Sequence, residues 1–428
     1  MLPFITVLPA QAGTGHVAAT AAEPARAAGA QVRRVAWVRE LHWTSRRIAR
    51  GIILRHGVLQ RGGADQSAGD LGQAPGAEQV HEAIISPRAF RGRTEVIHDG
   101  PVAGPHTASA VAAAQHAALV VNGGFFIVSG ADGYPGAPAG LAVYHGQLES
   151  MSAGARGALV LGDGPARIEH LNSTASVRAG GSAFAVQGIN RLPGVIRNCG
   201  RPDSRPFRGP RQDTTCHSDS ELVLFTPQLG AAAPSGSGRE AVIGPRGTVR
   251  WAGPRRGGTA PAGGAIIEGI GRAATWLRRH ARTGRHVVVR ERLTDRAGQP
   301  LPLRPGMSIA SGAPVLLSHG RLAIDEAAEG VAFDYAWAKE RQPRTIAGIS
   351  RSGQLLLVTV DGRQPGRSDG ATLVEEAALM RALGAVSALN LDGGGSTTMV
   401  AGGRLVNSPS DGAERADGDF VVATPRRS

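Results

Sequence analysis

The amino-acid sequence predicts a mixed α/β or α+β fold, in which a mixed sheet is completed by a C-terminal strand–helix–strand (βαβ) unit. Three observations predict it. An apolar run at 355–360 suits a buried strand, residues 372–383 carry apolar side chains at helical spacing, and a second apolar run from 387 breaks at Asp392 into glycines. Short strands with glycine and proline turns fill residues 145–330, which predicts a β-rich central excursion.

Composition and charge restrict the class of protein. The chain has 428 residues, enough to bury a large core, and a formal net charge of +13. Lys339 is the only lysine, so the positive charge comes almost wholly from arginine. Because guanidinium groups match pairs of phosphate oxygens, a phosphodiester-linked sugar or an anionic glycan is the expected partner. Nucleic acid is not expected, since no basic run is interleaved with aromatics, and no stretch has the length of a transmembrane segment.

The start of the chain and its two cysteines predict a secreted or cell-surface protein. We expect residues 1–30 to hold a truncated signal peptide and a linker, although the usual charged segment is missing. Residues 31–79 are expected to be a poorly defined N-terminal region with a β-rich start. Cys199 and Cys216 lie close together in a loop rich in Pro, Arg and Asp, where a disulfide would agree with export. Two free thiols of a cytosolic protein are the alternative.

Residues 80–428 are expected to form the main domain. A strand within 311–320 returns the chain to the sheet, and another begins at Arg344, because Pro343 holds its approach extended. A last strand is expected at 420–423. The other expected elements are helices at 107–117 and 274–282, and strands at 80–85, 118–121, 141–145, 158–161, 183–189, 221–225, 241–243 and 286–291.

Polar residues follow three of these strands. Asp361 and Asp392 end the two strands of the βαβ unit, and Asn122 ends the strand at 118–121. Parallel strands of such a unit bring their carboxyl ends to one edge, where ligands bind. We therefore expect Asp361 and Asp392 at one edge, with Asn122 beside Asp392. Ordinary turns are the alternative, because Asp-Gly and Asn-Gly pairs often mark turns.

The segments around Asp392 predict an anion site. Arg344 begins its strand nearby, although a structural salt bridge is an alternative role for it. Glycines allow a ligand to approach the main chain closely. No lysine follows the glycines, which excludes a nucleotide-binding P-loop. The expected substrate- or phosphate-binding residues are Arg344, Thr345, Asn122, Gly123, Gly393, Gly394, Gly395, Ser396 and Thr397.

The sequence requires no cofactor. A divalent cation held by Asp361 and Asp392 stays open, but no spaced His/Asp cluster predicts a metal site.

Five motifs, taken in order, resemble the phosphodiester glycosidase family. The resemblance runs from Val80 to the C-terminus and is densest after Pro343. The sequence differs mildly from the family's pattern at residues 311–314 and after Thr345. These differences affect the loop that is expected to face the substrate. The family includes bacterial exported proteins linked to exopolysaccharide. The motifs are residues 122–126, 343–345 with Gly348, 360–363, 372–373 with Glu375, and 389–397.

The resemblance implies hydrolysis of a glycosyl-1-phosphodiester on an extracellular or cell-surface glycan, with release of free sugar and a phosphomonoester. Positive charge develops at the anomeric carbon, and a carboxylate stabilises it. Asp392 is the first candidate, with Asp361 or Glu375 as its partner. Glu375 lies in the first turn of its helix, where compensation of the helix dipole is the alternative role. Asn122 is expected to orient sugar hydroxyls.

Two other functions stay open. One is a non-catalytic cell-wall or polysaccharide-binding protein. Such a protein is expected to have lost a catalytic carboxylate or the phosphate-binding arginine, whereas this chain keeps Asp361, Glu375, Asp392 and Arg344. The other is a hydrolase of a different phosphoester, whose product would be phosphate. The sequence does not predict the sugar, the aglycone, the stereochemical course or the oligomeric state.

Overall fold

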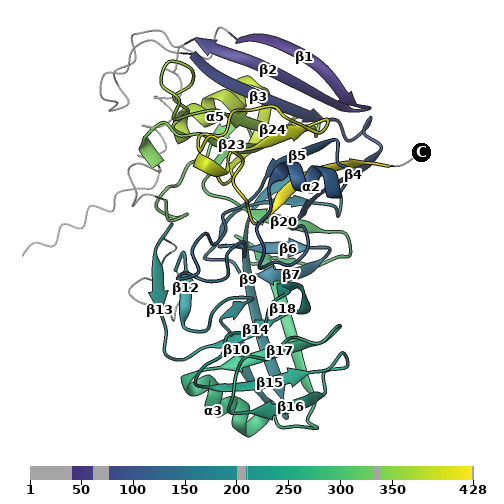
Figure 1. Cartoon of the computed structure of the whole chain (residues 1–428), viewed down its shortest axis with the longest axis vertical. Helices are drawn as coiled ribbons and strands as arrows, with labels where there is room; N and C mark the ends of the chain where they lie inside the picture. Colours follow the sequence, from purple (N-terminus) through teal and green to yellow (C-terminus); the bar gives the residue numbers. More distant parts are fainter. Residues whose placement is uncertain (1–40, 61–76, 200–208, 210, 332–337, 427–428) are drawn as a thin grey trace, which may run out of the picture.

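The computed structural model describes residues 41–60, 77–199, 209, 211–331 and 338–426. Of the described residues, 44% lie in strands and 10% in helices, in agreement with an α+β or β-rich fold. Figure 1 shows an elongated molecule with strands β1 to β3 and helix α5 at one end, and strands β14 to β17 with helix α3 at the other. The expected signal peptide and linker at 1–30 lie outside the described residues, as do 31–40 and 61–76.

The largest sheet near the site is antiparallel throughout. Its strands β1 and β2 come from the region expected to be poorly defined, and they extend the sheet beyond β3. Apolar side chains such as Val80, Ile346 and Leu357 bury its inner face. In spatial order its strands are β1 (Leu41–Ala49), β2 (Ile52–Gln60), β3 (Ala77–Ile85), β24 (Leu355–Val360), β23 (Arg344–Ser350), β25 (Ala385–Asn390), β21 (Val315–Ser318) and β22 (Arg321–Leu322).

Strands β24 and β25 are not neighbours, which differs from the simple βαβ unit expected from the sequence. Strand β23 lies between them and pairs antiparallel with both. The two outer strands therefore still run in the same direction. Helix α5 (Leu373–Ala382) joins them and packs on β21, β23 and β25. Local sequence could not reveal the inserted strand, because strand pairing depends on segments far apart in the chain.

Helix α5 begins and ends where its sequence predicts. The Thr372 side chain accepts a hydrogen bond from the Glu375 backbone N–H, and the Glu375 carboxylate accepts one from the Thr372 N–H, which forms a capping box. Gly384, with φ of +90°, follows the helix end.

A five-stranded sheet holds Asn122 and the chain's last strand. Helix α2 (Ala108–Ala114) packs on it and is capped by Thr107, whose hydroxyl accepts from the Ala110 N–H at 3.3 Å. Val111, Val120 and Phe420 pack together between helix and sheet. The strands, in order, are β27 (Arg404–Leu405), β26 (Met399–Ala401), β5 (Leu119–Asn122), β28 (Phe420–Pro425) and β4 (Gly92–Ile97).

The central region is β-rich, as expected. Its larger sheet contains β19 (Pro300–Leu301), β18 (Val287–Asp295), β9 (Arg167–Ala179), β8 (Arg156–Leu161), β20 (Ser308–Ser311), β6 (Ala142–Tyr144), β7 (Gln147–Ser150) and β10 (Ser182–Val186). Its smaller sheet contains β11 (Gly188–Ile189), β14 (Leu222–Phe225), β17 (Ala265–Gly269), β15 (Arg239–Ile243) and β16 (Val249–Gly253), with a 3₁₀ turn at Pro227–Leu229. Helix α3 (Gly271–His280) starts three residues before the predicted 274 and buries Ala273, Trp276 and Leu277, while Arg278 and Arg279 stay exposed.

A disulfide joins Cys199 to Cys216, with 5.8 Å between their Cα atoms, so the alternative of two free thiols is excluded. It lies beside a hairpin of β12 (Val195–Arg197) and β13 (Thr215–His217). Both sulfur-bearing residues are buried against Ile196 in a small separate cluster. With so little apolar burial of its own, this hairpin depends on the covalent link.

The double variant Cys199→Ser/Cys216→Ser is expected to lose about 3 kcal/mol of unfolding free energy, because the bridge closes a 17-residue separation and restricts the unfolded chain. Urea denaturation followed by tryptophan fluorescence measures the change. Wild-type protein kept reduced should match the variant. Unchanged midpoints in both samples would show that the disulfide does not contribute to stability.

Candidate active site

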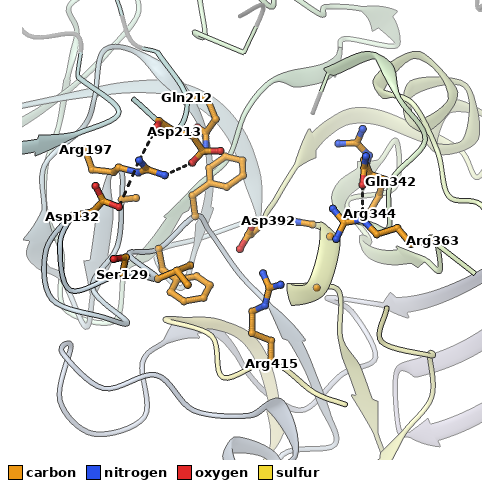
Figure 2. Close-up of a pocket in the computed structure, with 17 residues that line it drawn as sticks. Ser129, Asp132, Arg197, Gln212, Asp213, Gln342, Arg344, Arg363, Asp392 and Arg415 are labelled. Carbon is orange, nitrogen blue, oxygen red and sulfur yellow. Dashed lines mark hydrogen bonds and ion pairs between the residues drawn. The ribbon is translucent and has the colours of Figure 1, made fainter. Parts of the chain in front are cut away.

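A cavity of about 340 Å³ opens beside the loop that follows β25. Figure 2 shows Asp392 near its centre, with Gln342, Arg344 and Arg363 on one side and Asp132, Arg197, Gln212 and Asp213 on the other. Phe125 and Phe126 add apolar surface. Of the residues predicted from the sequence, the cavity wall contains Asp392, Gly393, Gly394, Gly395 and Arg344.

Asn122 holds the main chain at Asp392, so their predicted proximity is confirmed. The Asn122 side-chain amide donates to the Asp392 carbonyl at 2.7 Å, and the Asp392 N–H donates to the Gly123 carbonyl at 3.0 Å. The Thr345 hydroxyl in turn donates to the Asn122 Oδ1 at 2.7 Å. Asn122 is only 1% exposed and does not line the cavity. Its contacts hold the main chain at Asp392 in place.

The Asp392 carboxyl group has an unusual environment. Removal from bulk water raises its pKa to about 7. The Ser396 hydroxyl, the Arg415 guanidinium and the Gly393 N–H, which donates to Oδ1 at 3.0 Å, oppose this rise, while the nearby charge of Asp213 adds to it. Asp392 therefore exchanges its proton near neutral pH, as a group that takes part in acid–base chemistry must.

The three glycines meet different constraints. A Cβ at Gly393 would collide with the Pro343 carbonyl oxygen, Gly394 has φ of +60°, and a Cβ at Gly395 would collide with the Arg415 and Asp411 side chains where these now lie. The N–H groups of Gly394 and Ser396 donate to the carbonyls of Pro343 and Gly393, at 2.8 and 3.1 Å. These main-chain N–H groups of the expected phosphate site therefore already donate to carbonyl oxygens of the protein.

Four arginines line the cavity, and Arg363 and Arg415 are two of them. Arg363 is exposed, and its Nε donates to the Gln342 Oε1 at 2.7 Å. Arg415 is held by Asp411 at 2.6 Å, and its Nη1 lies 3.4 Å from the Ser396 hydroxyl. Arg363 belongs to a motif noted in the sequence, but neither residue was predicted as part of the site. No local pattern marks Arg415, because only tertiary folding brings its loop to Asp392.

Arg344 reaches the cavity wall from the protein interior. It is 2% exposed, its Nε lies 3.0 Å from the Glu376 Oε1, and it donates to the Ala371 carbonyl at 2.8 Å. Burial lowers the pKa of Arg344, and the two neighbouring glutamates oppose that effect. This environment fits the salt bridge considered as the alternative for Arg344.

Asp361 and Glu375 lie outside the cavity wall. Asp361 is completely buried, and its carboxylate accepts from the Ser408 N–H at 3.1 and 3.2 Å. Burial raises the pKa of Asp361. Glu375 caps α5 and pairs with Arg341 at 2.7 Å. Both carboxylates stabilise loops or helix ends around the site, although the strand ends at Asp361 and Asp392 do share one edge.

The remaining predicted residues are buried behind the cavity. Gly123, Thr345, Ser396 and Thr397 do not line it. The Ser396 hydroxyl interacts with both Asp392 and Asp417, an almost fully buried carboxyl group that the sequence did not single out. Burial and the neighbouring Asp392 raise the pKa of Asp417 well above its usual range.

Among the described residues, no group of three or more His, Cys, Asp or Glu side chains is arranged to hold a metal ion. Within the same residues, no helix combines the length and apolar character needed to cross a membrane.

Residues 239–424 of this chain match the model of the phosphodiester glycosidase family, in agreement with the resemblance inferred from the motifs.

Among individual proteins, the chain is similar to mouse N-acetylglucosamine-1-phosphodiester alpha-N-acetylglucosaminidase, with 36% identity over 118 residues. That match covers 26% of this chain and 22% of the mouse enzyme. A Bacillus subtilis prophage-derived uncharacterized protein, YomE, is 34% identical over 27% of this chain and 18% of its own length. The chain thus spans about a fifth of the length of these curated relatives.

One solved structure matches nearly the whole chain. It belongs to a Burkholderia pseudomallei protein whose provisional name calls it exported, with a TM-score of 0.80 and 26% identity over 90% of this chain and 96% of that one. A hypothetical protein from Synechocystis has the same fold, with a TM-score of 0.61 and 21% identity over 89% of this chain and 76% of that one.

Proposed function

We propose that this protein hydrolyses a glycosyl-1-phosphodiester bond and releases free sugar and a phosphomonoester. The observation that carries this proposal is Asp392, whose carboxyl group has a pKa of about 7 and faces a cavity that also contains Arg363 and Arg415. A carboxylate beside cationic groups suits a substrate that develops positive charge at carbon while a phosphate departs. The family match and the mouse relative support the same reaction.

In the proposed reaction the bond between the anomeric carbon and the phosphate oxygen breaks, and that oxygen keeps the electron pair. Water adds its oxygen to the anomeric carbon, and the proton that it loses passes to the departing phosphate or to solvent. The Asp392 carboxylate stabilises the positive charge that develops at this carbon. Arg363 and Arg415 bind the phosphate and stabilise the negative charge on its leaving oxygen.

The other candidate residues support the site from behind. We assign Asn122 and Thr345 to positioning Asp392, because they form a hydrogen-bonded chain to its carbonyl. Asp361 is assigned to holding Ser408, at the start of the segment that leads to Arg415. Arg344 and Glu375 are assigned to the structural framework.

We propose residues 80–428 as the catalytic domain, with residues 145–330 as an excursion from it, and a secreted or cell-surface location. The first part of this span supplies β5 and Asn122, and its last part supplies β28 and Arg415. The disulfide and the name of the similar Burkholderia protein support export. An extracytoplasmic glycan is therefore the proposed substrate.

The reaction is tested by incubating the purified protein with methyl diesters of several sugar 1-phosphates. Free reducing sugar and methyl phosphate are the expected products. Release of methanol and a sugar 1-phosphate, or of inorganic phosphate, would instead identify a hydrolase of another phosphoester bond. Intact diesters together with measurable glycan binding would favour a binding protein.

The pH profile tests the protonation state assigned to Asp392. Below pH of about 7, kcat/KM is expected to fall about tenfold per pH unit, because protonation removes the reactive carboxylate. The groups that face Asp392 are Arg415, Asp213, Asp417 and the Ser396 hydroxyl. Arg415→Met removes a cation that stabilises the ionised Asp392 carboxylate, so the acid limb of the profile should move to higher pH. Circular dichroism across the range controls for unfolding, and a flat profile in folded protein would contradict the assignment.

A further inference from the structure

The disulfide-linked hairpin forms the side of the cavity that faces away from Arg363 and Arg344. We call this side the hairpin wall and define it as Asp132, Arg197 and Asp213, which Figure 2 shows together across from Asp392. The chemistry assigned above uses none of these residues. The sequence did not single them out, because they meet only through the fold of the hairpin.

Asp213 is held rigidly in an uncommon conformation. Its backbone is left-handed, with φ of +58°, and its N–H donates to the Asn198 Oδ1 at 2.8 Å. The Asn198 side-chain amide donates to the Ala139 carbonyl at 2.8 Å. The Ala139 N–H in turn donates to the carbonyl of Phe125, which lines the cavity. Strained backbone conformations often occur at functional sites, where the surrounding structure maintains them. Here the maintained conformation directs a carboxylate into the cavity.

The charges of the hairpin wall do not cancel. The Arg197 Nη2 donates to the Asp213 Oδ1 at 2.7 Å, and its Nη1 lies 3.9 Å from the Asp132 Oδ2. Within the hairpin wall two carboxylates therefore face one guanidinium, while the charge of the buried Arg156, which donates to the Gln212 Oε1 at 2.8 Å, also acts on Asp213. The second carboxylate oxygen of Asp213 makes no hydrogen bond to any described residue, and the side chain is 50% exposed. That oxygen is free to accept a hydrogen bond from a ligand.

The two sides of the cavity differ in what they can bind. The side with Arg363, together with Arg415 below Asp392, attracts phosphate, whereas the hairpin wall offers acceptors for hydroxyl groups. Phe125 and Phe126 add apolar surface against which the carbon face of a sugar ring can pack. Asp213 and Asp392 both line this cavity, and the charge of Asp213 raises the pKa of Asp392.

We propose that the hairpin wall is the sugar subsite, in which Asp213 accepts a hydrogen bond from a sugar hydroxyl and selects neutral sugars over uronic acids. This inference rests on the proposed function, because it takes the position of the phosphate from it. A uronic acid would bring a third carboxylate toward Asp132 and Asp213, and like charges in contact strongly disfavour binding. The substrate class is therefore a neutral sugar linked through its anomeric phosphodiester.

The kinetic test compares methyl glucosyl-1-phosphate with methyl glucuronosyl-1-phosphate. Wild type should prefer the neutral sugar by about 100-fold in kcat/KM. Asp213→Asn should lower kcat/KM for the glucosyl diester by about 10-fold to 100-fold, because the charged acceptor is lost. It should also reduce the preference for the glucosyl over the glucuronosyl diester. It should also move the acid limb of the pH profile to lower pH, since a like charge near Asp392 disappears. Asparagine tolerates the left-handed conformation, so the fold is retained.

Asp219→Asn is the matched control, because Asp219 is an exposed aspartate just beyond β13 that does not line the cavity. It should leave both rate constants and the preference unchanged. Equal turnover of both diesters by wild type, or an unaltered preference in Asp213→Asn, would overturn the sugar subsite while leaving the proposed reaction intact.

A binding measurement separates the two hypotheses if no diester is hydrolysed. We would titrate Asp392→Asn protein with methyl glucosyl-1-phosphate and with methyl glucuronosyl-1-phosphate in a calorimeter. Tighter binding of the glucosyl compound that Asp213→Asn weakens would retain the sugar subsite and reject only the hydrolytic function. Equal binding of the two compounds, or no binding of either, would reject the subsite itself.

Discussion

Asp392→Asn is expected to lower kcat for release of free sugar by about a hundredfold to a thousandfold, the range seen when a group that stabilises transition-state charge is lost. Asparagine keeps the size of the side chain and can still accept from the Gly393 N–H, so the loop should stay intact. What disappears is the negative charge beside the anomeric carbon. Because Arg363 and Arg415 are untouched, binding of an intact diester should persist while turnover fails.

The control for this variant is Asp295→Asn. Asp295 is the last residue of β18, and its Oδ1 accepts from the N–H groups of Ala297 and Gln299 in the turn to β19, at 2.9 and 2.8 Å. It thus makes the same kind of carboxylate-to-backbone contact away from the cavity, and its replacement should not change kcat. If Asp392→Asn retains more than about a tenth of wild-type kcat, Asp392 is not the group that stabilises the developing charge.

At pH values above about 8, Arg344→Met is expected to lower the free energy of unfolding by about 3 to 5 kcal/mol, because it leaves the ionised Glu376 carboxylate buried without its cation. Burial already raises the pKa of Glu376 to about 8, with Arg344 opposing the rise. Removing Arg344 raises that pKa further. A raised carboxyl pKa stabilises the fold at low pH, and this contribution is lost as pH rises through the folded value. Above pH of about 8 the variant should therefore lose stability faster than wild type.

Urea denaturation at several pH values measures this effect. Lys339→Met is the matched control: Lys339 pairs with Glu326 at 2.7 Å, but the lysine side chain is 49% exposed, so its loss should change stability by less than about 1 kcal/mol. The double variant Arg344→Met/Glu376→Leu should recover most of the stability and remove the added pH dependence. A single variant as stable as wild type would mean that the buried pair has no structural role.

Much of the fold could be predicted because it depends on local sequence. The apolar run at 355–360 forms β24 with the predicted bounds, and Thr372 caps α5 through a hydrogen bond to a residue three positions along the chain. Helix α2 likewise begins after Thr107. Its predicted end at 117 was too late, because the helix ends at Ala114 and the chain turns toward β5. Such end positions depend on tertiary packing as well as on composition.

The candidate site was only partly predictable. Asp392 with its glycines, and its contact with Asn122, followed from the pattern of strands that end in polar residues. Asp361 followed the same pattern, but the fold turns its carboxylate inward to Ser408. A local pattern specifies that a carboxylate ends a strand, yet the side chain's neighbours come from distant segments. For the same reason Arg415 and Asp213 could not be found from the sequence.

By itself, the sequence determined the strands, the capped helix, the glycine loop after Asp392 and the motifs of the phosphodiester glycosidase family, because these depend on residues close together in the chain. Only the tertiary structure decided that β23 separates β24 from β25 and that Arg344 pairs with Glu376 in the interior. It also decided that Asp392 faces the cavity together with Arg415 and Asp213. Burial, charge and pKa are properties of surroundings, and the surroundings of a side chain exist only once the chain has folded.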